Sequence, residues 1–165
     1  MPKETPIISD SKVKYRGVFD LGLVYNKLRF WIMETGYSEP HEIKYVEKIK
    51  PGGKDIEIIW ESERSEEDGF FKFTIGVKFY ATRLNDVEVD KEGRKLKLQK
   101  GDLWLYFDAK FIVNANKKWE ENGLMYKLYE KFIIKDKLDH YKIELYTEAN
   151  KIMAEVKDFL NLYNL

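Results

Sequence analysis

Alternating apolar and polar positions run through most of the chain. The pattern is present from residue 12 to 19, returns after Pro40 and continues to Val113, most clearly at 70–83 and 103–113. A period of two is typical of strands that bury one face. Short turn sequences interrupt the pattern at 51–53, 65–69, 92–93 and 100–101. Strands joined by such short turns pair antiparallel, so we expect a curved β-meander of about six to seven strands.

Helical spacing of apolar residues occurs between Leu21 and Ile32 and again after Gly123. Asp20 is a suitable N-cap for the first helix, and Gly36 is suited to the position just beyond its end. The later part of the chain predicts a short helix at 124–134 and a long helix at 138–163. We expect Asp136 to cap that long helix.

The long helix carries an apolar stripe with a seven-residue repeat. Its members are Leu138, Leu145, Ile152 and Phe159. Such a helix is marginal in water by itself, so its stability must come from packing. We therefore expect it to lie across the concave face of the sheet.

The order of these elements predicts an α+β fold. Residues 1–10 contain two prolines and no periodicity, which indicates a loose N-terminal arm before a single domain at 11–165. We expect the strands at 70–83 and 103–113 to be central. Their core residues are predicted to be Phe71, Phe73, Ile75, Phe107 and Phe111.

A curved sheet on a long terminal helix resembles the helix-grip architecture of START-like lipid-binding domains and polyketide cyclases. The resemblance lies in the order of elements, and two features depart from it. Only one helix follows the first strand, and the helix at 124–134 is additional. Two segments are similar in amino-acid sequence to small uncharacterised archaeal proteins. They are the stretch from Gly17 to Tyr37 and the ending Phe159-Leu160-Asn161-Leu162-Tyr163. That second likeness implies no activity.

The charge balance of the 165 residues is even, with 29 Lys plus Arg and 29 Asp plus Glu. A protein that binds nucleic acid by counterion release usually has a large positive excess, which argues against that class. The absence of cysteine excludes disulfides and thiolate chemistry. Because no secretory signal or stretch long enough to span a bilayer is present, we expect a cytoplasmic protein. Many Lys and Glu with a single Gln suggest a thermophilic source.

The sequence contains no catalytic signature, no glycine-rich phosphate loop and no paired-histidine zinc motif. We therefore expect no cofactor, and an enzyme hypothesis rests on two features only. Glu47 shares a strand face with apolar residues, and burial there would raise its pKa. Alternatively, Glu47 lies near the strand end, reaches solvent or pairs with a Lys across the sheet. Asp136, His140 and Glu144 project on one helix face and could bind a divalent metal, or they could simply cap and decorate a solvated face.

We favour a non-enzymatic binding domain with an apolar, aromatic-lined pocket for a hydrophobic small molecule. The candidate ligand-binding residues are Tyr45, Glu47, Trp60, Phe73 and Phe107. The same rings could instead fill the core.

The alternative is an interaction or scaffold protein that binds a protein partner or a second copy through an aromatic face of the sheet or through the C-terminal helix. Its candidate contact residues are Trp104, Tyr106 and Tyr80, on the second face of the central strands. Either these rings form a contact patch, or a helix at 21–35 or 124–134 covers them.

Overall fold

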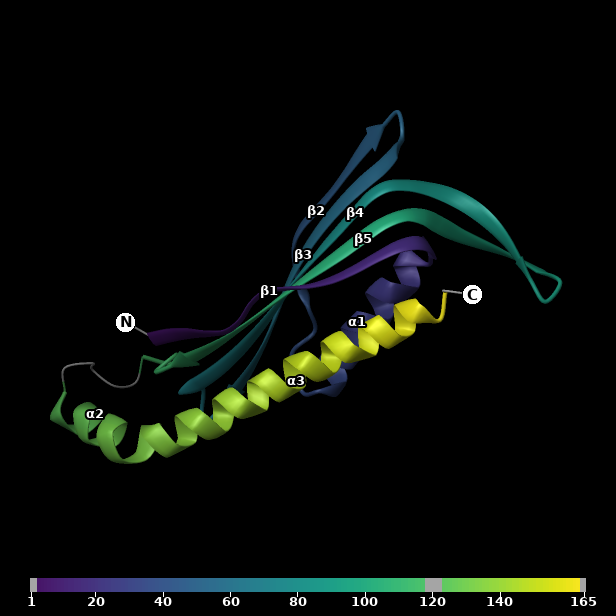
Figure 1. The fold of residues 1–165 in the computed structure, drawn as a ribbon. Helices are drawn as coiled ribbons and strands as arrows, with labels where there is room; N and C mark the ends of the chain where they lie inside the picture. The colour runs from purple at the N-terminus through teal and green to yellow at the C-terminus, as the bar shows by residue number, and fades with distance from the viewer. Residues whose placement is uncertain (1–2, 118–122, 164–165) are drawn as a thin grey trace.

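The fold is a five-stranded antiparallel sheet with helices against one face (Figure 1). The structure, a computed structural model, describes residues 3–117 and 123–163. Its elements are β1 (Lys3–Phe19), α1 (Leu21–Glu34), β2 (His41–Lys50), β3 (Gly53–Glu66), β4 (Phe71–Lys91), β5 (Arg94–Val113), α2 (Leu124–Tyr129), the π-helical turn η1 (Glu130–Ile134) and α3 (Lys135–Asn161). The strand order is β1-β5-β4-β3-β2, so the α+β class and the antiparallel sheet are confirmed.

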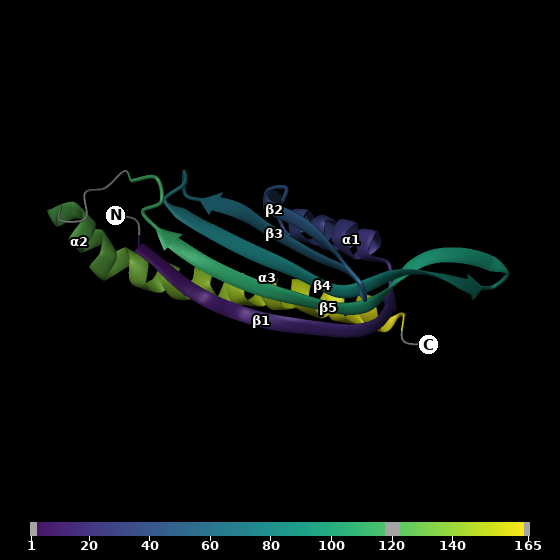
Figure 2. The ribbon, with the colours of Figure 1, turned by 90° about the horizontal axis from the view of Figure 1, so that it is seen from above.

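The central strands β4 and β5 supply most of the core. Their alternation puts every second side chain against the helices, and Phe71, Phe73, Ile75, Phe107 and Phe111 are all buried as predicted. In Figure 2 the strands pass over α3, which crosses the sheet on its core face. The ring of Tyr141 on α3 lies 5.0 Å from that of Phe71 and 5.3 Å from that of Phe73.

The sheet has five strands, and the expectation of six to seven is wrong because Lys100-Gly101 is not a turn. β5 continues through Gly101, and β4 continues beside it with a register shift between Thr82 and Asn85. A Cβ on Gly101 would lie 2.7 Å from the carbonyl oxygen of Thr82, so only glycine allows the two backbones to approach this closely. Beyond this point β4 and β5 continue past the rest of the sheet as a two-stranded ribbon, the distal ribbon, which spans residues 85–100 (Figure 1). The ribbon ends at Glu92-Gly93, where both φ angles are positive.

The first residues form a strand, which corrects the expectation of a loose arm. Residues 3–10 belong to β1 and pair with the end of β5, with Lys3 opposite Val113. β1 is an edge strand, and an edge tolerates the missing N–H of Pro6. Register shifts on either side of Ile8 adjust the pairing, and the backbone N–H of Asp10 donates to the carboxylate of Asp108.

Both predicted ends of α1 are confirmed. The carboxylate of Asp20 accepts a hydrogen bond from the backbone N–H of Leu23, and Gly36 has a φ of 102° just after the helix. The helix buries Val24, Leu28 and Ile32 against the same core as α3.

The C-terminal helices are continuous rather than separate. The turn η1 joins α2 to α3, so Asp136 lies in the first turn of α3 instead of capping a new helix. Leu145 and Ile152 from the seven-residue repeat are buried, whereas Leu138 and Phe159 pack at the border of the core. Within the described residues, no helix has both the length and the apolar composition that crossing a bilayer requires.

Candidate binding face of the sheet

The open face of the sheet, opposite the core, carries the aromatic residues that the sequence placed on second faces. In the described part of the chain no helix lies over this face (Figure 2), which carries Trp104, Tyr106 and Tyr80 side by side. A helix does cover Phe70, whose ring lies 5.6 Å from that of Tyr129 in α2. The sequence left open whether the aromatic residues form an exposed contact patch or are covered by a helix. The first possibility applies to Trp104, Tyr106 and Tyr80, and the second applies to Phe70.

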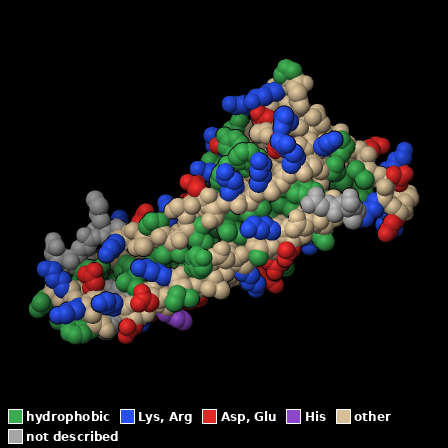
Figure 3. All heavy atoms as spheres, in the orientation of Figure 1, with side chains coloured by type: hydrophobic (Ala, Val, Ile, Leu, Met, Phe, Trp, Pro, Cys, Tyr) green, Lys and Arg blue, Asp and Glu red, His purple; other side chains and the backbone are tan. Residues whose placement is uncertain are grey.

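Strand register collects these aromatic residues and three lysines into two adjacent rows. Tyr80 of β4 lies opposite Trp104 of β5, which lies opposite Lys14 of β1. In the next row, Lys78 and Lys12 stand on either side of Tyr106. The rows surround a shallow groove of about 650 Å³, lined by Asp10, Lys12, Lys78, Tyr80, Thr82, Trp104 and Tyr106. Figure 3 shows Lys and Arg side chains interspersed with hydrophobic ones over this part of the sheet.

Two of the lysines, Lys12 and Lys14, lie against the aromatic rings. The ring centroids of Trp104 and Tyr106 are 6.5 Å apart, and the Nζ atom of Lys12 lies 5.2 Å from the first and 5.7 Å from the second. The Nζ atom of Lys14 lies 4.9 Å from the Trp104 ring. Each exposed contact of this kind is worth only about 0.5–1 kcal/mol, so a ligand ring can displace the ammonium groups.

The charges next to the groove are unevenly balanced. Asp102 binds the guanidinium groups of Arg83 and Arg16, whose hydrogen bonds lower its pKa. Glu57 pairs with Lys44 at 3.1 Å. Within residues 3–117 and 123–163, however, the three lysines of the two rows (Lys12, Lys14 and Lys78) form no ion pair, and two of them, Lys12 and Lys78, line the groove. Asp10 contributes one carboxylate to the lining. The groove therefore has a local positive excess although the whole chain is neutral.

Three of the five predicted ligand-binding residues lie in the core. Trp60, Phe73 and Phe107 are each no more than 2% exposed. The Trp60 ring packs edge-on against Tyr25 at 4.5 Å and Phe79 at 4.6 Å. These side chains fill the space between helices and sheet.

The other two, Tyr45 and Glu47, lie together on the edge strand β2. The Tyr45 hydroxyl donates a 2.6 Å hydrogen bond to the Glu47 carboxylate, and this bond raises the pKa of Tyr45 to about 12. The same hydrogen bond lowers the pKa of Glu47, which is the reverse of the shift expected for a buried acid. Both residues line a second groove of about 320 Å³, whose floor includes Ile56, Ile58 and Leu84.

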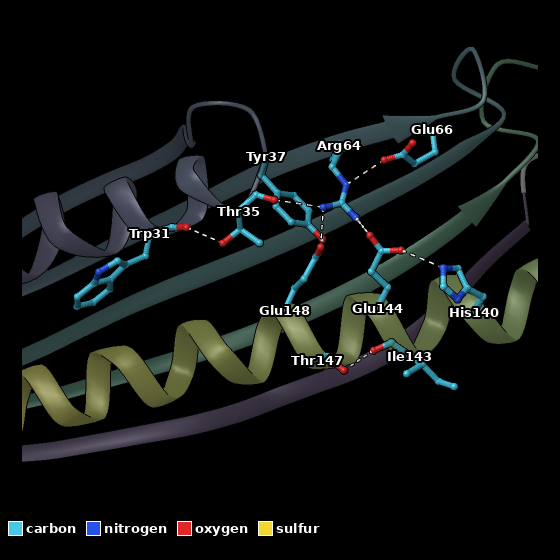
Figure 4. A network of polar contacts seen from close by, with 10 residues as sticks. All are labelled: Trp31, Thr35, Tyr37, Arg64, Glu66, His140, Ile143, Glu144, Thr147 and Glu148. Carbon is cyan, nitrogen blue, oxygen red and sulfur yellow. Dashed lines mark hydrogen bonds and ion pairs between the residues drawn. The ribbon is translucent and has the colours of Figure 1, made fainter.

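Sequence reasoning missed a polar network that joins β3 to α3 (Figure 4). Arg64 donates to Glu148 at 2.7 Å and to Glu144 at 2.9 Å, and its guanidinium lies 4.9 Å from the Tyr37 ring and 4.6 Å from the Phe73 ring. The Tyr37 hydroxyl also donates to Glu148.

This network engages one of the three residues that could have bound a metal, Glu144. Glu144 faces Arg64 rather than a solvated surface, and its other oxygen lies 3.8 Å from Nε2 of His140. The described residues contain no group of His, Asp and Glu arranged to hold a metal ion. Because its charges bind one another, the network fastens the long helix to the sheet.

No family model matches the chain, and no curated protein matches its sequence. Function is therefore inferred from the chain's own residues.

Proposed function

We propose that the protein is a non-enzymatic binding domain that binds an anionic ligand with a flat ring on the open face of its sheet. The observation that carries the proposal is the pair of rings, Trp104 and Tyr106, beneath lysines that lack carboxylate partners among the described residues. A flat ring gains about 1–3 kcal/mol by stacking on an aromatic side chain. The displaced ammonium groups are then free to pair with a phosphate or carboxylate of the ligand.

The neutral charge of the chain does not oppose this mode of binding. Counterion release along many phosphates needs a large basic surface, whereas a stacking platform needs only a few local cations. A flat ring next to a phosphate occurs in a free nucleotide and in a single-stranded nucleic acid. Both sources offer the same chemistry to the groove.

The test compares two probes, uridine monophosphate and a single-stranded oligouridylate of about ten nucleotides. We expect at least one of them to bind, and we expect Trp104→Ala to weaken binding by about tenfold or more. Tyr146→Ala removes an exposed ring from α3 and is the matched control, which should bind like the unmodified protein. Failure of both probes to bind, or equal losses in the two variants, would contradict the proposal.

Salt dependence distinguishes the two sources. If Lys12, Lys14 and Lys78 each neutralise one phosphate of a single strand, the logarithm of the association constant falls with the logarithm of salt concentration with a slope of about −2. Lys12→Gln should make the slope shallower, whereas Lys95→Gln, on the distal ribbon, should leave it unchanged. A protein that prefers the mononucleotide instead has its natural ligand among small molecules.

A second candidate function is the binding of an apolar small molecule in the groove beside Tyr45 and Glu47. Its buried apolar floor favours this function, since a polar rim over an apolar base is typical of ligand sites. Gly22 lines the groove, and a Cβ there would meet only the Asp20 carboxylate, at 3.5 Å, so we expect the side chain of Gly22→Phe to occupy part of the groove. Organic extraction of the purified protein should release an apolar compound that the variant lacks. An extract without such a compound would rule this candidate out.

A further inference from the structure

An exposed apolar face lies at the opposite end of the molecule from the distal ribbon, on α2 and η1. Leu124, Met125, Leu128 and Phe132 are 75%, 66%, 46% and 67% exposed. Side chains four positions apart stack along one side of a helix, so Leu124, Leu128 and Phe132 form a row with Met125 beside it. In Figure 3 the lower left end of the molecule shows hydrophobic side chains among basic and acidic ones.

The opposite side of α2 packs against the domain, so the apolar row faces outward. Tyr126 is buried, and the ring of Tyr129 packs on Phe70. Glu67 of the turn before β4 binds Lys137 at 2.5 Å and also accepts a hydrogen bond from the hydroxyl of Tyr129. These contacts hold the helix to the domain without covering the apolar row.

A row of lysines runs beside the apolar row. Lys127, Lys131 and Lys135 are exposed, and each follows a member of the apolar row by three positions. Glu130 lies two positions after Leu128, on the opposite side of the helix. Asp136 is exposed and follows Phe132 by four positions, which places it on the side of the helix that carries the apolar row. An apolar stripe bordered by lysines is the pattern of helices that lie in the interface of a membrane.

We propose that this face, formed by α2 and η1, docks on the surface of an anionic lipid bilayer. The apolar row enters the boundary between headgroups and acyl chains, and the lysines contact the lipid phosphates. A second copy of the chain is a poorer occupant. A two-fold contact through the same face would bring the lysine rows of both copies together, and like charges repel. The docking is independent of the sheet groove.

Vesicle sedimentation tests the proposal with the full-length chain. We expect binding to vesicles that contain phosphatidylglycerol and much weaker binding to vesicles of phosphatidylcholine alone. The double variant Lys127→Gln/Lys131→Gln should bind anionic vesicles about 30-fold less tightly, and Asp136→Asn should bind about fivefold more tightly. Leu128→Glu/Phe132→Glu should abolish binding.

The matched control is Ile143→Glu/Tyr146→Glu, which adds two carboxylates at exposed apolar positions on α3. It should bind vesicles nearly as well as the unmodified protein. All the altered side chains are exposed, so melting curves should confirm that each variant folds. Equal binding to both kinds of vesicle, or equal loss in the two glutamate variants, would overturn the proposal. So would a dimer that Leu128→Glu/Phe132→Glu dissociates in the absence of any vesicle binding.

Discussion

The guanidinium of Arg64 donates a 2.7 Å hydrogen bond to the carboxylate of Glu148 and thereby ties β3 to α3. Arg64 is only 13% exposed and stacks on the rings of Tyr37 and Phe73. Its removal would leave the carboxylates of Glu148 and Glu144 together without their cation. The pair therefore controls how firmly the long helix is attached.

We predict that Arg64→Ala lowers the free energy of unfolding by about 3 kcal/mol, because breaking a largely buried ion pair leaves an uncompensated charge. Chemical denaturation measures this loss. The control is Arg29→Ala, which breaks the surface pair with Glu39 and should cost less than about 1 kcal/mol. Equal losses in the two variants would show that the network adds nothing to a surface pair.

Phe73 is fully buried on the central strand β4, between the rings of Phe111 and Tyr141. We predict that Phe73→Ala lowers the free energy of unfolding by about 3–5 kcal/mol, the range for truncation of a buried Phe. Phe30→Ala is the control, because Phe30 is 58% exposed on α1. A loss below about 1 kcal/mol for Phe73→Ala would be inconsistent with its place in the core.

Asp102 gives the fold a defined dependence on pH. Hydrogen bonds from Arg83 and Arg16 lower its pKa below the ordinary value of 3.8. A carboxylate whose pKa is lowered by folding stabilises the fold at pH values above its pKa in the unfolded chain. This stabilisation is lost as the pH falls through its pKa in the folded protein.

Asp102→Asn should therefore be less stable than the unmodified protein near neutral pH, and the difference should shrink below pH 3.8. Unfolding free energies at a series of pH values measure the difference. Asp158→Asn, at an exposed position of α3, controls for the loss of one negative charge. A difference that stays constant at acidic pH would contradict this account.

Truncation after Lys137 tests the role of the long helix. It removes Leu145, Ile152 and the other buried residues of α3, together with the ring of Tyr141 that covers Phe71. We predict that the fragment aggregates or fails to melt cooperatively, because the aromatic face of the sheet would be exposed to water. A soluble fragment with a cooperative melting transition would show that the sheet is stable alone.

Much of the fold could be predicted because alternation and capping act locally. The run from Phe71 to Ala81 and the cap at Asp20 each depend on neighbouring residues only. The number of strands was predicted wrongly at Gly101, because a glycine beside Lys is typical of a turn. Its actual role, the close approach of a neighbouring backbone, depends on a contact that the sequence does not show. Residues 3–10 were missed for a similar reason, since their order comes from pairing with β5.

The candidate site could be predicted only in part from the sequence. Period-two alternation correctly grouped Trp104, Tyr106 and Tyr80 on one face, but the register that adds Lys12 and Lys14 from a strand far away in the chain required the structure. The sequence pattern did not indicate the buried network of Arg64, because its carboxylate partners come from α3 and the ring of Tyr37, on which it stacks, comes from the segment after α1.

The most direct test of the proposed function is the map of backbone amide chemical-shift changes when uridine monophosphate and, in a separate experiment, single-stranded oligouridylate are added to the protein. Binding on the open face predicts that the largest changes fall at 12–14, 78–82 and 104–106, around the groove that Trp104 and Tyr106 line. Changes centred on Tyr45 and Glu47 or on α2, or no changes at all, would contradict the account.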